Sequence, residues 1–177
     1  AGSLASWSVG TNVPAADRGP DKPVRVEGPQ GRLGRCDEAL TAGPALMVGP
    51  SGRRLLLHYV DEPAHPIGEM RYVEQGACQV GLPVLFFALR AAGLFDRLRL
   101  NGKQLDAPRL SVDDLAGVEV NVGPPEARAS FEAVGADVLA RVVQAQRDAD
   151  LLAADRRRLI DAFIATSTVG GEGGSDG

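Results

Sequence analysis

Residues 126–166 read EARASFEAVGADVLARVVQAQRDADLLAADRRRLIDAFIAT and contain no proline. The stretch is rich in Ala, Leu, Arg and Gln, which favour helices, so it predicts a helical segment of about forty residues. Larger apolar residues recur three or four positions apart, as on one helix face: Val138, Val142, Leu152, Leu159 and Phe163. We call these five residues the helix stripe. Arg156 interrupts it and Asp148 to Asp150 favours a break, so one long helix or a helical hairpin would both satisfy the pattern.

Residues 23–123 carry shorter patterns of a different kind. Apolar and polar residues alternate in VRVEG (24–28), and two apolar runs flank a Pro/Gly turn in residues 44–60, which predicts a strand followed by a hairpin. Residues 61–68, DEPAHPIG, contain two prolines and predict a loop, and MRYVEQGACQV (70–80) predicts a further strand with a bulge at Gly76. Leu82 to Phe95 predicts a helix with Pro83 in its first turn.

The stretch LNGKQLDAPRLSVDDLAGVEVNV, residues 100–122, suggests how these elements combine. Asn101-Gly102 predicts a tight hairpin turn, Ser111 to Gly117 a short capped helical turn, and VEVNV a final strand. The order of a Gly-Lys-Gln-Leu turn, a Leu-Ser turn and a strand resembles the second half of a ubiquitin-like β-grasp domain. That resemblance implies a β-grasp-like mixed sheet with one packed helix, in a fold often used for protein docking. The expected class is α+β, with a long C-terminal helix or helical hairpin after the sheet.

These patterns divide the chain into four parts. Residues 1–22 predict an extended or disordered arm in which Trp7 is the residue suited to anchor it to the body or to a partner. Residues 23–123 form the α+β domain, residues 124–166 the helical segment, and the Gly- and Ser-rich residues 167–177 a disordered tail.

Composition limits the function classes. The chain has 177 residues, a formal net charge of −4 and no apolar run of the roughly 20 residues that a bilayer requires. Its basic residues are scattered apart from Arg156 to Arg158, which predicts that nucleic acid is not a partner. Two cysteines and no signal-peptide pattern favour a reducing compartment, the cytoplasm or an organelle matrix, over secretion.

No catalytic, phosphate-binding or metal-binding motif stands in the sequence, so neither a cofactor nor a metal site is predicted. The favoured interpretation is a non-catalytic structural or interaction subunit of a multiprotein assembly, with other protein subunits as partners. Trp7 and the helix stripe are its candidate partner-binding residues. The alternative is a small enzyme or ligand-binding domain that uses Cys78 as a nucleophile with His58 as its base.

Overall fold

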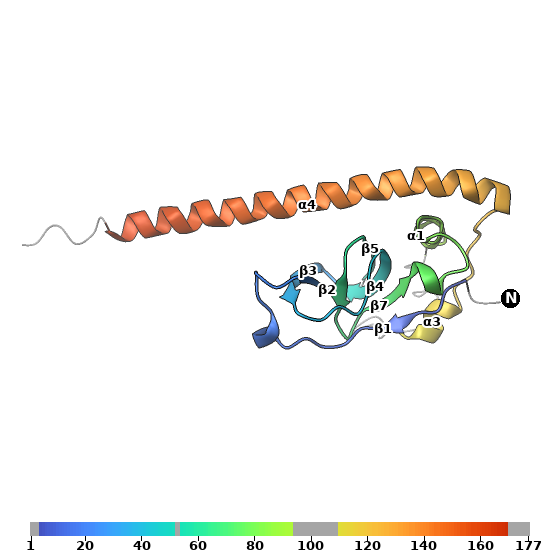
Figure 1. Cartoon of the computed structure of the whole chain (residues 1–177), viewed down its shortest axis with the longest axis horizontal. Coiled ribbons are helices and arrows are strands. Elements are labelled where there is room, and N and C mark those ends of the chain that lie inside the picture. Colours follow the sequence, from blue (N-terminus) through green and yellow to red (C-terminus); the bar gives the residue numbers. More distant parts are fainter. Residues whose placement is uncertain (1–3, 52–53, 94–109, 170–177) are drawn as a thin grey trace, which may run out of the picture. The chain divides into compact units, whose positions relative to one another are not determined.

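The computed structural model describes residues 4–51, 54–93 and 110–169 (Figure 1). The chain divides into two compact units, Ala1–Leu139 and Ala140–Gly177. The first unit is α+β, as the sequence predicted, and contains two small β-sheets. The second is helical.

A four-stranded antiparallel sheet forms the centre of the first unit. Its strand order is β1-β7-β4-β5, with these bounds: β1 Ser8–Val9, β7 Arg71–Glu74, β4 Ala45–Ser51 and β5 Arg54–Val60. The hairpin of β4 and β5 confirms the prediction for residues 44–60. Strand β4 is central and buried on both faces: Leu46 and Val48 join the main core, while Ala45 and Met47 join a second cluster around Met70. Successive side chains on a strand point to opposite faces, so the apolar run of β4 contributes side chains to both the main core and the second cluster.

A three-stranded sheet lies in the same unit, with strand order β3-β2-β6. Strand β2 (Val24–Gly28), predicted from VRVEG, pairs antiparallel with β3 (Gly31–Cys36) and parallel with β6 (Ala64–Pro66). The prediction that residues 61–68 are only a loop is wrong at β6. Because β6 is an edge strand, Pro66 can occupy its end without breaking an inner ladder of hydrogen bonds.

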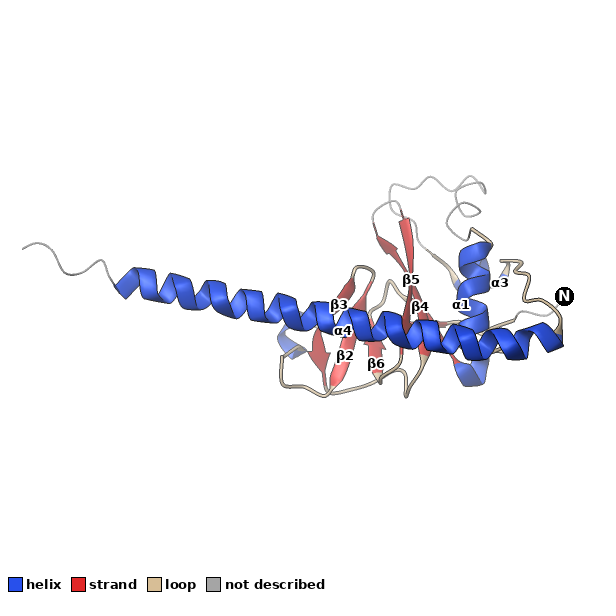
Figure 2. Cartoon of the chain, turned by 90° about the horizontal axis from the view of Figure 1, so that it is seen from above, coloured by secondary structure: helices blue, strands red, loops and turns tan. Residues whose placement is uncertain are grey.

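Helix α1 (Leu82–Ala91) lies beside β4 (Figure 2) and packs against it. Pro83 is in its first turn. The predicted strand over residues 70–80 stops at Glu74, where a 3₁₀ turn, η2 (Gln75–Ala77), replaces the expected bulge. Gln75 explains the change, since its side-chain oxygen accepts a hydrogen bond of 2.9 Å from the Leu82 amide at the start of α1.

Helix α3 (Val112–Ala116) confirms the predicted capped turn. Ser111 and Asp114 form a capping box, and Leu115 is buried. Residues 118–122, predicted as a strand, pair with no strand among the described residues, but Val118, Val120 and Val122 still pack on the main core. The alternation in VEVNV therefore marks a half-buried extended segment.

The resemblance to a ubiquitin-like β-grasp domain is wrong. In place of one mixed sheet across a helix, the described strands form two sheets, and the final strand of the motif is absent from the described part. The predicted Asn101-Gly102 hairpin lies outside the described residues.

Residues 4–11 run beside the segment 66–79. Strand β1 pairs with β7, Ser6 N donates to Ala77 O at 2.9 Å, and Gln79 N donates to Leu4 O at 2.9 Å. Trp7 is 8% exposed and belongs to the main core, while another 3₁₀ turn, η1 (Ala15–Asp17), follows. This part of the N-terminal segment thus completes the sheet edge and the core.

Helix α4 (Pro125–Val169) is one continuous helix of 45 residues, without a break at Asp148 to Asp150. In the first unit its residue Gly135 allows close approach to α1, because a Cβ there would lie 3.1 Å from Pro83 Cβ. Leu139 is buried in the main core. No helix among the described residues is long and apolar enough to cross a membrane.

Candidate functional site

The β2–β3 hairpin, VRVEGPQGRLGRC (24–36), concentrates arginine and glycine at a sheet edge. Gly31 and Gly34 have φ angles of +112° and +142°, which favour glycine over any residue with a Cβ. A Cβ at Gly28 would overlap the Leu33 side chain. The tight turn therefore depends on its glycines, and it leaves β3 as the outer strand of the sheet.

Residues 18–36 form a local positive region, which we call the basic hairpin. They contain five basic residues and two acidic ones, a net charge of +3 in a chain of net charge −4. One of the two acidic residues, Glu27, is fully buried. Three of the five cations pair with carboxylates from outside the segment, those of Asp37 and Glu62. The positive excess is therefore local and partly compensated.

Backbone and side-chain contacts hold several of these cations in place. Arg35 Nη1 donates to Pro23 O at 2.5 Å, and Arg18 Nη2 donates to Val13 O at 2.6 Å. Lys22 Nζ lies 2.6 Å from Asp37 Oδ2, and this hydrogen bond raises the pKa of Lys22. Held side chains lose less conformational entropy when they contact a phosphate.

A buried polar network lies beneath the hairpin. Glu27 Oε2 accepts from Arg25 Nε at 2.6 Å, and Glu27 Oε1 lies 3.5 Å from His58 Nδ1. His58 Nε2 lies 3.2 Å from Pro29 O, in the turn between β2 and β3. Since His58 belongs to β5, it connects the basic hairpin to the other sheet.

His65 has a structural role. Its Nδ1 lies 2.9 Å from Glu38 O and its Nε2 lies 2.9 Å from Thr11 Oγ1. With Nδ1 protonated the neutral ring donates to the carbonyl and accepts from the hydroxyl, so both nitrogens are satisfied. No group of three metal-ligating side chains occurs among the described residues.

Cys78 and His58 occupy separate surroundings. Cys78 follows η2, pairs with Ala5 through an isolated bridge, and packs on the main core, whereas His58 contacts Glu27 and Pro29. No hydrogen bond joins the two within the described chain, and burial raises the pKa of the Cys78 thiol to about 11. Neither observation supports the alternative of a Cys–His nucleophile formed by these two residues.

The candidate partner-binding residues fall into two groups. Trp7 is in the core, while four members of the helix stripe are exposed: Val138, Val142, Leu152 and Leu159. In the second unit Leu152 and Leu159 are 70% and 72% exposed, a high value for leucine. The side chain of Phe163 lies outside the described set. Whether these residues bind a partner stays a prediction.

A solved structure has a similar fold. The chain matches the S subunit of a Type-I restriction-modification system from M. genitalium with a TM-score of 0.68 and 16% sequence identity, over 88% of this chain. Its fold is similar to part of that subunit. The match spans 42% of that subunit's length. No family model and no curated protein matches the sequence.

This similarity corrects two predictions. The ubiquitin-like resemblance is replaced by a fold similar to part of this S subunit. The prediction that excluded nucleic acid as a partner no longer stands, because the protein with the similar fold belongs to a restriction-modification system. Sequence reasoning missed the basic hairpin because the charge of the whole chain hides a local excess. Counting charge over residues 18–36 would have found it.

Proposed function

We propose that this chain is a non-catalytic, DNA-recognising subunit of a multiprotein restriction-modification assembly. The observation that carries the proposal is the S-subunit fold over 88% of the chain. In this proposal the α+β unit contacts DNA through the basic hairpin, and the helix stripe docks other protein subunits. Such a subunit works where the cell's DNA is accessible, which favours the cytoplasm among the predicted compartments.

The basic hairpin suits a DNA phosphate backbone. Arginine forms paired hydrogen bonds with phosphate oxygens, and glycines let the protein backbone come close to a ligand. Arg32 is exposed on the outer strand β3, and Arg35 lies on the same strand. The network of Glu27 and His58 supports the turn from inside.

Salt-dependent binding of DNA tests the first half of the proposal. Fluorescence anisotropy would follow a 30-base-pair duplex pool with a randomised centre at several salt concentrations. Each phosphate contact contributes about 0.9 to the slope of log K against log salt, so Arg32→Ala should lower the slope by about 1. Arg157→Ala, an exposed arginine of the second unit, is the matched control and should leave the slope unchanged.

Two results would contradict DNA binding by the basic hairpin. One is absence of binding to the pool at low salt, and the other is an equal slope for Arg32→Ala and the unaltered chain. Selection from the same pool gives a further check, since a recognition subunit should enrich a defined sequence motif.

The second part of the proposal is that the helix stripe binds other protein subunits. Exposed leucines at Leu152 and Leu159 on one face of α4 fit a helix that packs against a partner subunit. The variant Leu152→Lys/Leu159→Lys should abolish co-purification with the partner subunits. Ala154→Lys, on the opposite face of the same helix, is the control. If the double variant recovered the partner subunits as well as the unaltered chain does, the helix stripe would not be their binding surface.

A further inference from the structure

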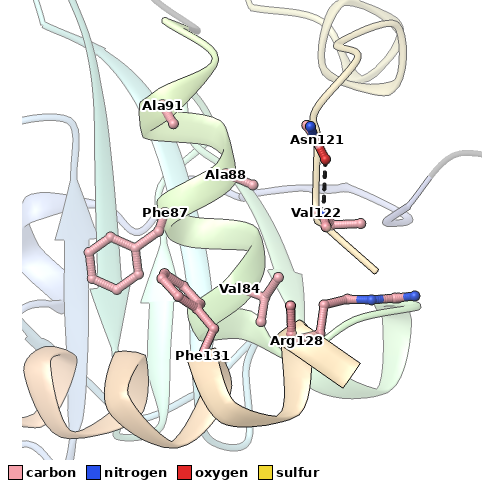
Figure 3. A pocket seen from close by; sticks show the side chains of 10 residues that line it. Val84, Phe87, Ala88, Ala91, Asn121, Val122, Arg128 and Phe131 are labelled. Carbon is pink, nitrogen blue, oxygen red and sulfur yellow. Dashed lines mark hydrogen bonds between the residues drawn. The ribbon is translucent and has the colours of Figure 1, made fainter. Parts of the chain in front are cut away.

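Two adjoining pockets flank Arg128 in the first unit. The first has a volume of about 330 Å³ and lies between α1, the beginning of α4 and residues 121–123 (Figure 3). Its walls are mainly apolar, and include Val84, Phe87, Ala88, Val122 and Phe131. The cavity is large enough for one aromatic side chain of a ligand.

The second pocket has a volume of about 440 Å³ and more polar walls. Gln75, Cys78, Gln79 and Glu132 contribute to it, and it shares Val84 and Arg128 with the first pocket. We call these two adjoining pockets the groove; it is mainly apolar at one end and more polar at the other, with Arg128 at the junction.

Aromatic rings line the apolar end. Phe87 and Phe131 meet edge to face, with ring centroids 5.6 Å apart and an interplanar angle of 88°. Phe131 is nevertheless 45% exposed, and in Figure 3 its ring stands between Phe87 and Val84. A half-exposed aromatic ring beside a cavity is typical of a protein-binding surface.

Arg128, at the junction, has an unsatisfied donor. Within the described part of the chain, its Nε atom is buried without a hydrogen-bond partner. The nearby carboxylate of Glu132 lies against Gly81, the N-cap of α1, where a Cβ would overlap its Oε1 atom. The positive end of the α1 dipole accommodates Glu132. Arg128 therefore remains available for an acidic group from outside.

We propose that this groove binds a segment of a partner protein in which an aromatic side chain stands beside a carboxylate. The aromatic ring fills the apolar pocket against Phe87 and Phe131, and the carboxylate accepts hydrogen bonds from Arg128. The segment belongs to another protein subunit, and its binding does not depend on the DNA contact proposed for the basic hairpin.

Peptide binding to the full chain provides the test. The probes are fluorescein-labelled 12-residue peptides with one central Phe flanked by Asp, and matched peptides with Lys in place of Asp. The acidic peptides should bind, and Arg128→Ala should weaken them by about tenfold or more, the effect of one charged hydrogen bond. Ala91→Trp, which fills the apolar pocket from an exposed position of α1, should also block binding. Arg157→Ala serves as the control.

Cys78 reports occupancy of the groove directly. It lines the polar pocket and is half-buried, whereas Cys36 is buried elsewhere, so a thiol reagent should label Cys78 faster and bound peptide should slow that labelling. Failure of all acidic peptides to bind, equal binding of the Lys peptides, or binding that Arg128→Ala leaves unchanged would each overturn the proposal. Protection of Cys78 by a 30-base-pair duplex and not by the acidic peptides would overturn it as well.

Discussion

Removal of the Glu27 carboxylate should destabilise the first unit strongly. Glu27 is fully buried, and its Oε2 atom accepts from Arg25 Nε at 2.6 Å. Glu27→Ala would leave the Arg25 side chain, only 13% exposed, without its nearest counter-charge. Loss of one partner of a buried pair costs about 3 to 5 kcal/mol. Glu62 Oε1 lies 3.7 Å from Arg25 Nη1 and partly compensates the charge of Arg25. We therefore expect Glu27→Ala to lower the free energy of unfolding by about 3 kcal/mol.

Urea denaturation followed by circular dichroism would measure this loss as a change in the free energy of unfolding. Glu62→Ala is the matched control: its side chain is 30% exposed, so its removal should cost less than about 1 kcal/mol. The double variant Arg25→Met/Glu27→Leu removes both charges and should recover most of the lost stability. A loss below about 1 kcal/mol for Glu27→Ala would refute the reasoning that this buried pair holds the hairpin in place.

Three further predictions concern other parts of the first unit. Gly10→Ala should destabilise it by about 3 kcal/mol, because the new Cβ would overlap the carbonyl oxygens of Ile67 and Pro66, and an unchanged melting temperature would contradict this. Ser111→Ala should cost about 1 kcal/mol in urea denaturation through loss of the α3 capping box, and a neutral effect would mean that α3 needs no cap. Cys78 should react with iodoacetamide about tenfold faster per pH unit between pH 8 and 10, because its pKa of about 11 keeps the thiol protonated; a rate that levels off near pH 9 would argue against this pKa.

The local sequence pattern predicted the elements that are stabilised by residues close together in the sequence. The proline-free stretch predicted one long helix or a helical hairpin, and the structure has the first of these as α4. Two apolar runs on either side of a Pro/Gly turn predicted the β4–β5 hairpin. Ser111 and Asp114 predicted the capped turn of α3, since a capping box needs only residues three positions apart. Each of these elements is stabilised mainly by neighbours in sequence.

Elements that depend on distant partners were missed. Strand β1 has two residues and forms by pairing with β7, about sixty positions away, so the sequence predicted only an extended or disordered arm over residues 1–22. Strand β6 forms by parallel pairing with β2 although Pro63 precedes it and Pro66 is its last residue. The β-grasp resemblance failed for the same reason, because an order of elements does not specify which strands pair.

The basic hairpin, which is the candidate functional site, was missed for a different reason. Net charge was averaged over the chain, whereas a charge count over residues 18–36 alone shows the positive excess. The structure adds that two of the arginines, Arg32 and Arg35, lie on the edge strand β3. Cys78 and His58, by contrast, were chosen by residue type, and the folded chain places them in separate surroundings.

The pairing of β1 with β7 also bears on how this chain can be shortened. Strand β7 has β1 on one side and β4 on the other, so without β1 its backbone amides and carbonyls would form a new open edge. A chain beginning at Pro23 would also lose Trp7 from the core. Open strand edges template association with other chains, so such a truncation should yield aggregates. The N-terminal residues thus protect solubility as well as stability.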